Sequence, residues 1–214
     1  MSDPREGSDA ARFVSMFGGD PSDGASLPGN SVDGNPPGFE AVLRQFHKRI
    51  YNFAYRLIGD ADEAADLTQE AFVNAYKAYG RFQGSSQAVY PWLCKILVNG
   101  CKNKFREMNR RGRYEILSLD EPLESGESRI DVQIGDLSSS PEGVLQRREL
   151  EARIQESIQM LPPEYRIVVV LRDMQGLSYK EISDVTGITM ENVKARLFRA
   201  RAALRRKLQT YIQD

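Results

Sequence analysis

The stretch from Leu177 to Arg201 constrains the fold most, because it carries the signals for two short helices separated by a tight turn. Ser178 and Glu181 have the spacing of a capping box, in which the hydroxyl accepts a backbone N–H and the carboxylate reaches back to the cap. A helix is therefore predicted to follow. Gly187 ends it, because a residue without Cβ adopts a left-handed backbone at low cost, and Thr189 can cap the next helix. This order predicts a helix-turn-helix.

The second helix of this motif is amphipathic and strongly basic. Its apolar residues recur at helical spacing and predict a buried stripe of Val193, Leu197, Ala200, Leu204 and Leu208. Basic residues occupy the remaining surface, namely Lys194, Arg196, Arg199, Arg201, Arg205 and Arg206. Such a helix fits the major groove of DNA, with arginines on phosphates and some side chains at base edges. A solvated basic surface is the alternative, but the capped first helix and the glycine turn favour DNA binding.

Charge is segregated along the chain, although the net charge is only −1 at pH 7. Acidic residues concentrate in 1–40, 60–70 and 115–142, whereas basic residues crowd 95–113 and 194–207. This pattern predicts separate surfaces for basic and for acidic partners. With 214 residues, of which 41% are hydrophobic, the chain has room for one large or two small domains.

Several classes of protein are disfavoured by what the sequence lacks. No apolar run approaches the ~20 residues that cross a bilayer, and no signal peptide is evident, so a cytoplasmic chain without membrane insertion is expected. Cys94 and Cys101 lie about two turns apart on one predicted helix, and we expect buried small side chains rather than a disulfide or metal site. His47 is the only histidine and has no nucleophile beside it. The sequence therefore predicts neither an enzyme nor a metal or cofactor site.

The expected fold is all-α, with two small helical domains joined by a flexible acidic linker. Residues 1–38 are rich in Gly, Ser, Asp and Pro and predict a disordered arm, whose apolar island at 12–17 could instead dock on the body or on a partner. Residues 39–113 form the first predicted domain, 114–141 the linker, and 142–214 the second domain.

Helical periodicity places the individual helices. In the first domain we predict helices from Phe39 to Gly59, from the capping box at Asp60 to Gly80, and from Pro91 into the basic run ending at Arg113. In the second domain, Pro141 is well placed in the first turn of a helix that ends before Pro162, and a further helix is predicted from Tyr165 to Met174.

Five motifs, taken in order, match one known family. They are Asp62-Glu-Ala-Ala-Asp-Leu-Thr-Gln-Glu-Ala-Phe72, Arg81-Phe-Gln-Gly84, Trp92-Leu-Cys-Lys-Ile-Leu-Val-Asn99, Leu161-Pro-Pro-Glu-Tyr-Arg166, and Gly176-Leu-Ser-Tyr-Lys-Glu-Ile182 through Arg199-Ala-Arg201. Together they closely resemble the bacterial RNA polymerase σ factors of the extracytoplasmic-function class, over residues of about 39–113 and 142–212. The resemblance implies two domains, named σ2 and σ4, that direct core polymerase to promoters and promote DNA melting, in a stress or envelope response.

The resemblance also implies protein partners. The second helix of σ2 would bind the β′ clamp helices of core polymerase through an acidic and amide-bearing face made of Asp62, Glu63, Asp66, Gln69 and Glu70. A solvated acidic helix face is the alternative for these residues taken by themselves. The β flap of core polymerase and an anti-σ factor are further expected partners. The acidic linker resembles the segment that the family threads toward the RNA exit path, and a plain tether explains it nearly as well.

Promoter contacts are implied on both domains. The −10 element would be read and melted by the loop at 83–87 with the aromatic residues after it, because a melted base can be stacked and hydrogen-bonded. The residues are Gln83, Ser85, Ser86, Gln87, Tyr90, Trp92, Asn99, Lys102, Arg106 and Arg110. Core packing is an equal alternative for Trp92. The loop is one residue longer than the common family pattern, and Pro91 stands where Thr is frequent.

In σ4 the resemblance assigns −35 recognition to the helix that begins at Met190. The expected contacts are Glu191, Asn192, Lys194, Arg196, Phe198 and Arg199. A different class of function, a stand-alone helix-turn-helix regulator that dimerises on a palindrome, remains the rival hypothesis. The basic helix and aromatic loop of the first domain disfavour it, because a sensing or dimerisation domain needs neither.

Overall fold

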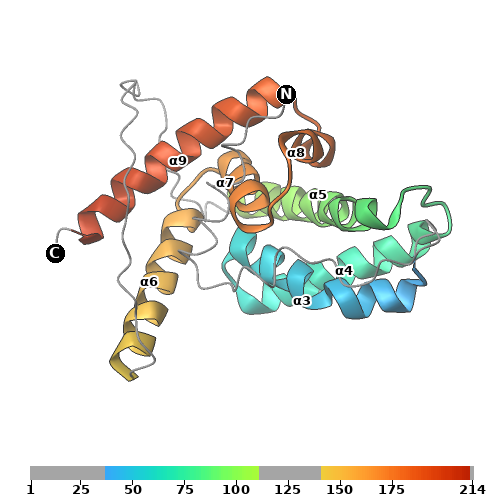
Figure 1. Cartoon of the computed structure of the whole chain (residues 1–214), viewed down its shortest axis with the longest axis horizontal. Coiled ribbons are helices and arrows are strands. Elements are labelled where there is room, and N and C mark those ends of the chain that lie inside the picture. The colour runs from blue at the N-terminus through green and yellow to red at the C-terminus, as the bar shows by residue number, and fades with distance from the viewer. Residues whose placement is uncertain (1–36, 111–140, 213–214) are drawn as a thin grey trace.

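A computed structural model describes residues 37–110 and 141–212 of the chain (Figure 1). Within these two ranges the chain forms helices and turns and no strand, which confirms the predicted all-α fold. The predictions for the N-terminal arm and for the linker fall on residues 1–36 and 111–140, which lie outside the described residues.

The first domain consists of three helices that pack on one another: α3 (Phe39–Ile58), α4 (Ala61–Tyr79) and α5 (Val89–Arg110). Gly59 ends α3 with a φ of 85°, and the Asp60 carboxylate caps α4 by accepting the Glu63 N–H at 2.9 Å, as the capping box predicts. A 3₁₀ turn, η1 (Ser86–Ala88), leads into α5, which begins two residues before the predicted start at Pro91.

The second domain contains α6 (Pro141–Gln159), α7 (Pro163–Val169), α8 (Tyr179–Thr186) and α9 (Met190–Ile212). The helix predicted from Tyr165 to Met174 begins earlier, at Pro163, and its end is a π-helical segment, η2 (Val170–Met174). There the Gln175 N–H donates to the Val170 carbonyl at 3.0 Å, five residues back, and this wider turn was not predictable from periodicity.

The two domains lie against each other, as Figure 1 shows for α5 beside α7 and α8. Helix α3 also contacts α6, α7 and η2, and the buried residues of both domains form one continuous apolar cluster. The sequence predicted a flexible linker between the domains and did not predict these contacts. Gln and Arg side chains of the second domain bind backbone carbonyls of the first, and such contacts leave no periodic signal in the sequence.

Candidate nucleic-acid interface

The helix-turn-helix has the predicted local geometry. Ser178 Oγ accepts the Glu181 N–H at 3.2 Å, and Glu181 Oε2 accepts the Ser178 N–H at 2.7 Å, so both halves of the capping box are present. Gly187 has a φ of 77° and turns the chain into α9, where Thr189 Oγ1 accepts the Asn192 N–H at 3.3 Å. The turn between the two helices is thus specified from both sides.

One face of α9 packs inward and the other is accessible. Val193, Leu197, Ala200 and Leu204 are buried, as the apolar stripe predicts. On the outer face, Glu191, Asn192, Lys194, Phe198 and Arg199 are exposed, the Phe198 side chain by 58%. Arg196 is only partly exposed and lines a cavity between the domains. Arg201, expected on the cationic surface, instead forms an ion pair with Asp173 and is committed to the fold.

The loop at 83–87 combines exposed polar groups with aromatic packing. Gln83, Ser85 and Gln87 are exposed, while Ser86 is partly buried at the start of η1. The Trp92 ring lies 4.9 Å from the Phe82 ring and 5.9 Å from the Tyr79 ring, centroid to centroid. Trp92 is therefore partly buried in an aromatic cluster that supports the loop.

Tyr90 does not have the accessibility that base stacking requires. Its ring is buried, 5.4 Å from the Phe46 ring, with the Arg49 guanidinium 3.7 Å from the ring centre. Its hydroxyl donates to Gln175 Oε1 at 2.5 Å, and burial raises the pKa of Tyr90 well above its usual value. The predicted contact of Tyr90 with a flipped base does not fit this arrangement, because the ring packs in the core and its hydroxyl binds the second domain.

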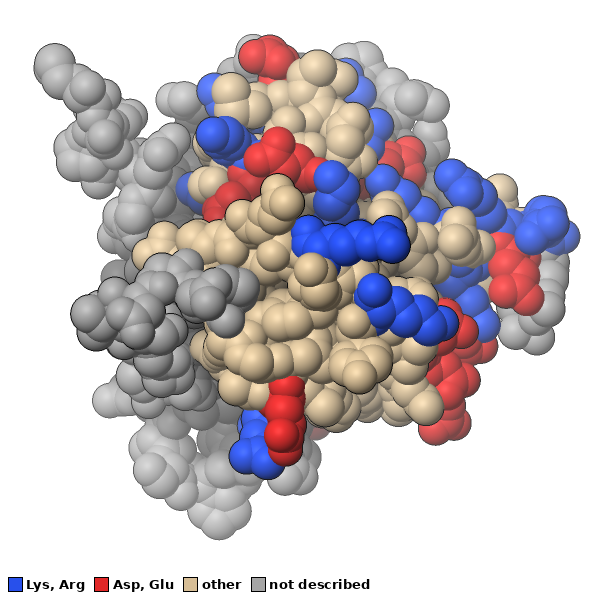
Figure 2. All heavy atoms as spheres, turned by 90° about the vertical axis from the view of Figure 1, so that its right-hand side faces the viewer, with Lys and Arg blue, Asp and Glu red and all other residues tan. Residues whose placement is uncertain are grey.

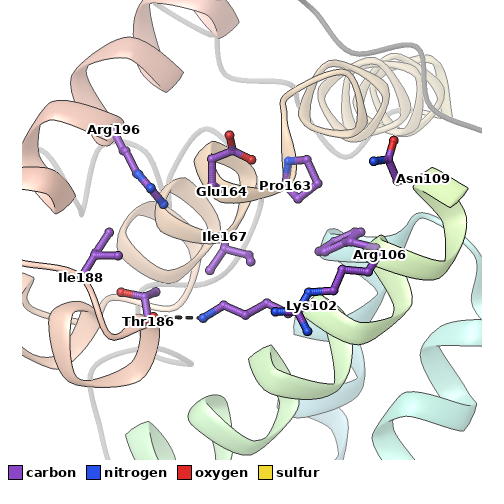
Figure 3. Close-up of a pocket in the computed structure, with 10 residues that line it drawn as sticks. Lys102, Arg106, Asn109, Pro163, Glu164, Ile167, Thr186, Ile188 and Arg196 are labelled. Atoms are coloured by element: carbon purple, nitrogen blue, oxygen red, sulfur yellow. Dashed lines mark hydrogen bonds between the residues drawn. The ribbon is translucent and has the colours of Figure 1, made fainter.

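Helix α5 carries the remaining residues expected at the −10 element. Asn99, Arg106 and Arg110 are exposed, and Lys102 is partly buried. The Lys102 ammonium donates to the Thr186 carbonyl at 2.9 Å, across the boundary between the domains (Figure 3).

A cavity of about 340 Å³ lies beside this contact, lined by apolar side chains and by cations of both domains (Figure 3). Lys102 and Arg106 come from α5, and Arg196 comes from α9. Burial lowers the pKa of Lys102, and the charges of Arg106, Arg196 and Lys95 lower it further. Residues expected to contact two different promoter elements thus converge at one place.

A wider view shows the same grouping of charge. On the face that Figure 2 shows, Lys and Arg side chains, with some Asp and Glu among them, lie beside a broad area of uncharged residues. Backbone phosphates of a nucleic acid are attracted to a cationic surface of this kind.

The acidic face of α4 is accessible for a partner. Asp62, Asp66, Gln69 and Glu70 are exposed, whereas Glu63 is partly buried and forms an ion pair with Lys104 of α5. The same helix also exposes two apolar residues that sequence reasoning missed, Val73 by 45% and Tyr76 by 69%. The sequence does indicate them, because Val73 and Tyr76 follow Asp66 and Glu70 at the three- and four-residue spacing of one helix face.

Cys94 and Cys101 do not offer reactive thiols. Both are fully buried, and burial raises the pKa of each to about 12. Among the described residues no group of three His, Cys, Asp or Glu side chains could hold a metal ion. None of the helices in the described ranges is both long and apolar enough to span a bilayer.

Comparisons with known proteins agree with this geometry. Residues 42–111 match the family model of σ70 region 2, and residues 151–204 match the model of σ70 region 4. The RNA polymerase sigma-H factor of Pseudomonas aeruginosa is 34% identical over 85% of this chain and 91% of its own length. The ECF RNA polymerase sigma-E factor of Escherichia coli K12 is 31% identical over 84% of this chain and 91% of its own. The chain belongs to the extracytoplasmic-function σ factors.

Solved structures of the class have the same fold. The sigma factor RpoE of Bartonella quintana, in complex with the anti-sigma factor NepR, superposes with a TM-score of 0.57 at 23% identity and covers 80% of this chain and 96% of its own. As a σ factor, this chain is a transcription initiation factor that directs RNA polymerase to promoters. Its σ2 domain contains α3–α5, and its σ4 domain contains the helix-turn-helix.

Proposed function

We propose that the chain binds core RNA polymerase, places σ2 on the −10 element and σ4 on the −35 element, and promotes melting of the promoter. The observation that carries the proposal is the separation of surfaces. Two groups of exposed cations lie on α5 (Lys95, Arg106, Arg110) and α9 (Lys194, Arg199, Arg206), whereas the exposed face made of Asp62, Asp66 and Glu70 lies on α4. A protein that must bind a basic protein surface and two stretches of DNA needs these three surfaces.

Core polymerase is the proposed partner of α4. Its β′ clamp helices would meet Asp62, Asp66, Gln69 and Glu70, with Glu63 held back by Lys104. Val73 and Tyr76 extend the same side of the helix with apolar surface, which suits the centre of a protein interface better than a solvated face does. The β flap would hold σ4.

For the −10 element, Gln83, Ser85, Ser86 and Gln87 would bind a base that has left the stack, supported by Trp92. Asn99, Lys102, Arg106 and Arg110 would hold the backbone beside it. Tyr90 is left out of this proposal because it is buried. For the −35 element, the exposed residues of α9 would enter the major groove, with Phe198 available for an apolar contact to a thymine methyl group.

Regulation by an anti-σ factor is part of the proposal, in a stress or envelope response and in the cytoplasm, where polymerase acts. A relative of the same fold was solved in complex with the anti-sigma factor NepR. Another, CnrH, was solved in complex with the cytosolic domain of CnrY and superposes with a TM-score of 0.54 at 18% identity, covering 94% of this chain and 97% of its own. Such a partner would have to cover the accessible surfaces of α4 and α9.

In vitro transcription with core polymerase, followed by mapping of start sites, tests the proposal. Permanganate footprinting on a mapped promoter should then show unpaired thymines near −10 only when the chain and core are both present. Opening of the duplex by the isolated chain at physiological salt would contradict the proposal and support the stand-alone regulator.

A further inference from the structure

The C-terminal end of α3 is capped by side chains of the other domain. The last carbonyls of a helix carry the negative end of its dipole and have few partners within the helix. At the end of α3 the Gly59 N–H donates to the Tyr55 carbonyl at 2.8 Å. Gln155 Nε2 donates to the Tyr55 carbonyl at 3.1 Å, and Gln159 Nε2 donates to the Arg56 carbonyl at 2.8 Å. Arg166 Nη1 donates to the Leu57 carbonyl at 2.6 Å. Three consecutive carbonyls of σ2 are therefore bound by α6 and α7 of σ4.

Arg166 is the centre of this contact. Its side chain is fully buried, and it also donates to Gln159 Oε1 at 2.7 Å and to the Leu161 carbonyl at 3.0 Å. Its guanidinium lies 5.4 Å from the centre of the Phe105 ring of α5. A buried cation is costly unless hydrogen-bond acceptors surround it. The end of α3 supplies one of these acceptors, so Arg166 is best satisfied when the two domains are together.

Two further contacts lie on the same boundary. Arg49 Nη2 of α3 donates to the Gln175 carbonyl at 2.7 Å, and the Tyr90 hydroxyl donates to the Gln175 side chain. Gln175 is only 9% exposed. On the other side of the boundary, Lys102 binds the carbonyl of Thr186 at the end of α8.

The contact at Lys102 has a consequence for DNA binding. A lysine that donates to a carbonyl inside the protein is less available for a phosphate, and Arg196 is partly buried in the same cavity. The cavity also brings three cations together without a carboxylate other than that of Glu164 among its lining residues. Their mutual repulsion opposes the docked form, whereas the apolar cluster shared by the two domains and the capping of α3 favour it.

We propose that the C-terminal end of α3 is a docking site for σ4 of the same chain, and that the docked form withholds Lys102 and Arg196 from DNA. The partner is chemically matched, because amide and guanidinium donors meet carbonyls at the negative end of a helix dipole. The part that concerns DNA rests on the function proposed above. Release of σ4 from α3 then makes Lys102 and Arg196 accessible to DNA.

The test is an interdomain distance measured by electron paramagnetic resonance on the full chain without polymerase. Spin labels are attached at Lys48→Cys on α3 and Lys180→Cys on α8, both of which are exposed. The native thiols do not interfere, because Cys94 and Cys101 are buried and their pKa values are raised to about 12.

The opening variant is Gln155→Ala combined with Gln159→Ala. It removes the amide donors to the Tyr55 and Arg56 carbonyls and the side-chain oxygens that accept from Arg56 and Arg166. The matched control is Gln45→Ala combined with Asn74→Ala, which removes two amide side chains at exposed positions of σ2. We expect one short distance in the labelled parent and the control, and a longer, broad distribution in the opening variant.

Binding of fluorescein-labelled oligothymidylate gives the second readout. The opening variant should bind about tenfold tighter than the control, although neither variant changes the net charge, if about nine-tenths of the parent is docked. A broad distribution in the parent, or an unchanged short distance in the opening variant, would overturn the docking site. A third outcome is a short distance in the parent that is lost in the opening variant, while no variant binds the oligonucleotide. This outcome would support docking and contradict the proposed role in DNA binding.

Discussion

Arg201 of α9 and Asp173 of η2 form an ion pair in which the carboxylate is buried and the guanidinium is partly exposed. Arg201 Nε donates to Asp173 Oδ2 at 3.0 Å, and a second hydrogen bond joins Arg201 Nη2 to Oδ1. The Asp173 side chain is 1% exposed and that of Arg201 is 36% exposed. The pair therefore joins α9 to η2.

The unequal burial of the two partners predicts unequal costs of removing them. Arg201→Met leaves the Asp173 carboxylate buried without its cation and should lower the free energy of unfolding by about 3 kcal/mol or more. Asp173→Asn leaves a neutral amide that can still accept from Arg201, and Arg201 can reach solvent. Asp173→Asn should therefore lower the free energy of unfolding by less than Arg201→Met does. Urea denaturation of both variants measures the two losses. Equal losses would mean that the ion pair is not the main contribution of either residue.

Local features of the fold follow from the sequence, because they depend on neighbours along the chain. The capping box at Ser178, the side-chain cap at Asp60 and the left-handed turn at Gly187 were predicted at the residue where they occur. Contacts between distant polar residues were not predictable. Arg166 was part of a family motif, yet nothing in its sequence context indicates that it binds a carbonyl of α3. Tyr90 was expected to contact a melted base because it lies beside a polar loop. An aromatic residue in such a place can equally well pack in the core, and the sequence pattern does not distinguish the two arrangements.

The two buried thiols predict a loss of stability at alkaline pH. Burial raises the pKa of Cys94 and of Cys101 from 9.0 to about 12. Below pH 9 the thiols are protonated in both the folded and the unfolded chain, so their contribution is fully present. Between pH 9 and 12 only the unfolded chain loses these protons, and the free energy of unfolding falls. The fall should be smaller in a Cys94→Ala, Cys101→Ala variant, as measured by denaturation across this range.

Two glycines with left-handed backbones predict different responses to alanine. At Gly187 a Cβ would meet nothing within 4 Å, so Gly187→Ala should cost only the backbone strain, about 1–2 kcal/mol. At Gly59 a Cβ would lie 2.8 Å from the Gln159 side chain, so Gly59→Ala adds displacement of a side chain that caps α3. Thermal denaturation should show the larger loss for Gly59→Ala. The opposite order would indicate that Gln159 relaxes without cost.

Promoter recognition by σ4 predicts a selective loss at Arg199. Arg199 is exposed on the outer face of α9, and the hydrogen bond that its guanidinium donates to the Tyr165 hydroxyl is long at 3.5 Å. If its guanidinium binds a base edge, Arg199→Ala should weaken −35 binding by about 1–3 kcal/mol and relax specificity at one position. The measurement is transcription by reconstituted holoenzyme from promoters with and without a −35 element. Lys48→Ala, which removes an exposed cation of σ2, is the control and should behave like the parent.

Docking on core polymerase predicts a large effect of charge reversal on α4. Asp66→Lys combined with Glu70→Lys changes two exposed carboxylates into cations and should weaken binding to core, because like charges then face the basic partner surface. Neither residue belongs to the buried stripe of Leu67 and Ala71, so the helix content and the unfolding transition should stay unchanged.

The matched control for this charge reversal is Glu149→Lys combined with Glu156→Lys on α6, which changes the net charge equally at exposed positions. Affinity for core, measured by titration in a pull-down, should fall in the α4 variant and not in the α6 variant. An equal fall in both would show that net charge, rather than the α4 face, governs the association. Unchanged affinity in both would place the interface elsewhere on σ2, and the exposed Val73 and Tyr76 would then be the next residues to substitute.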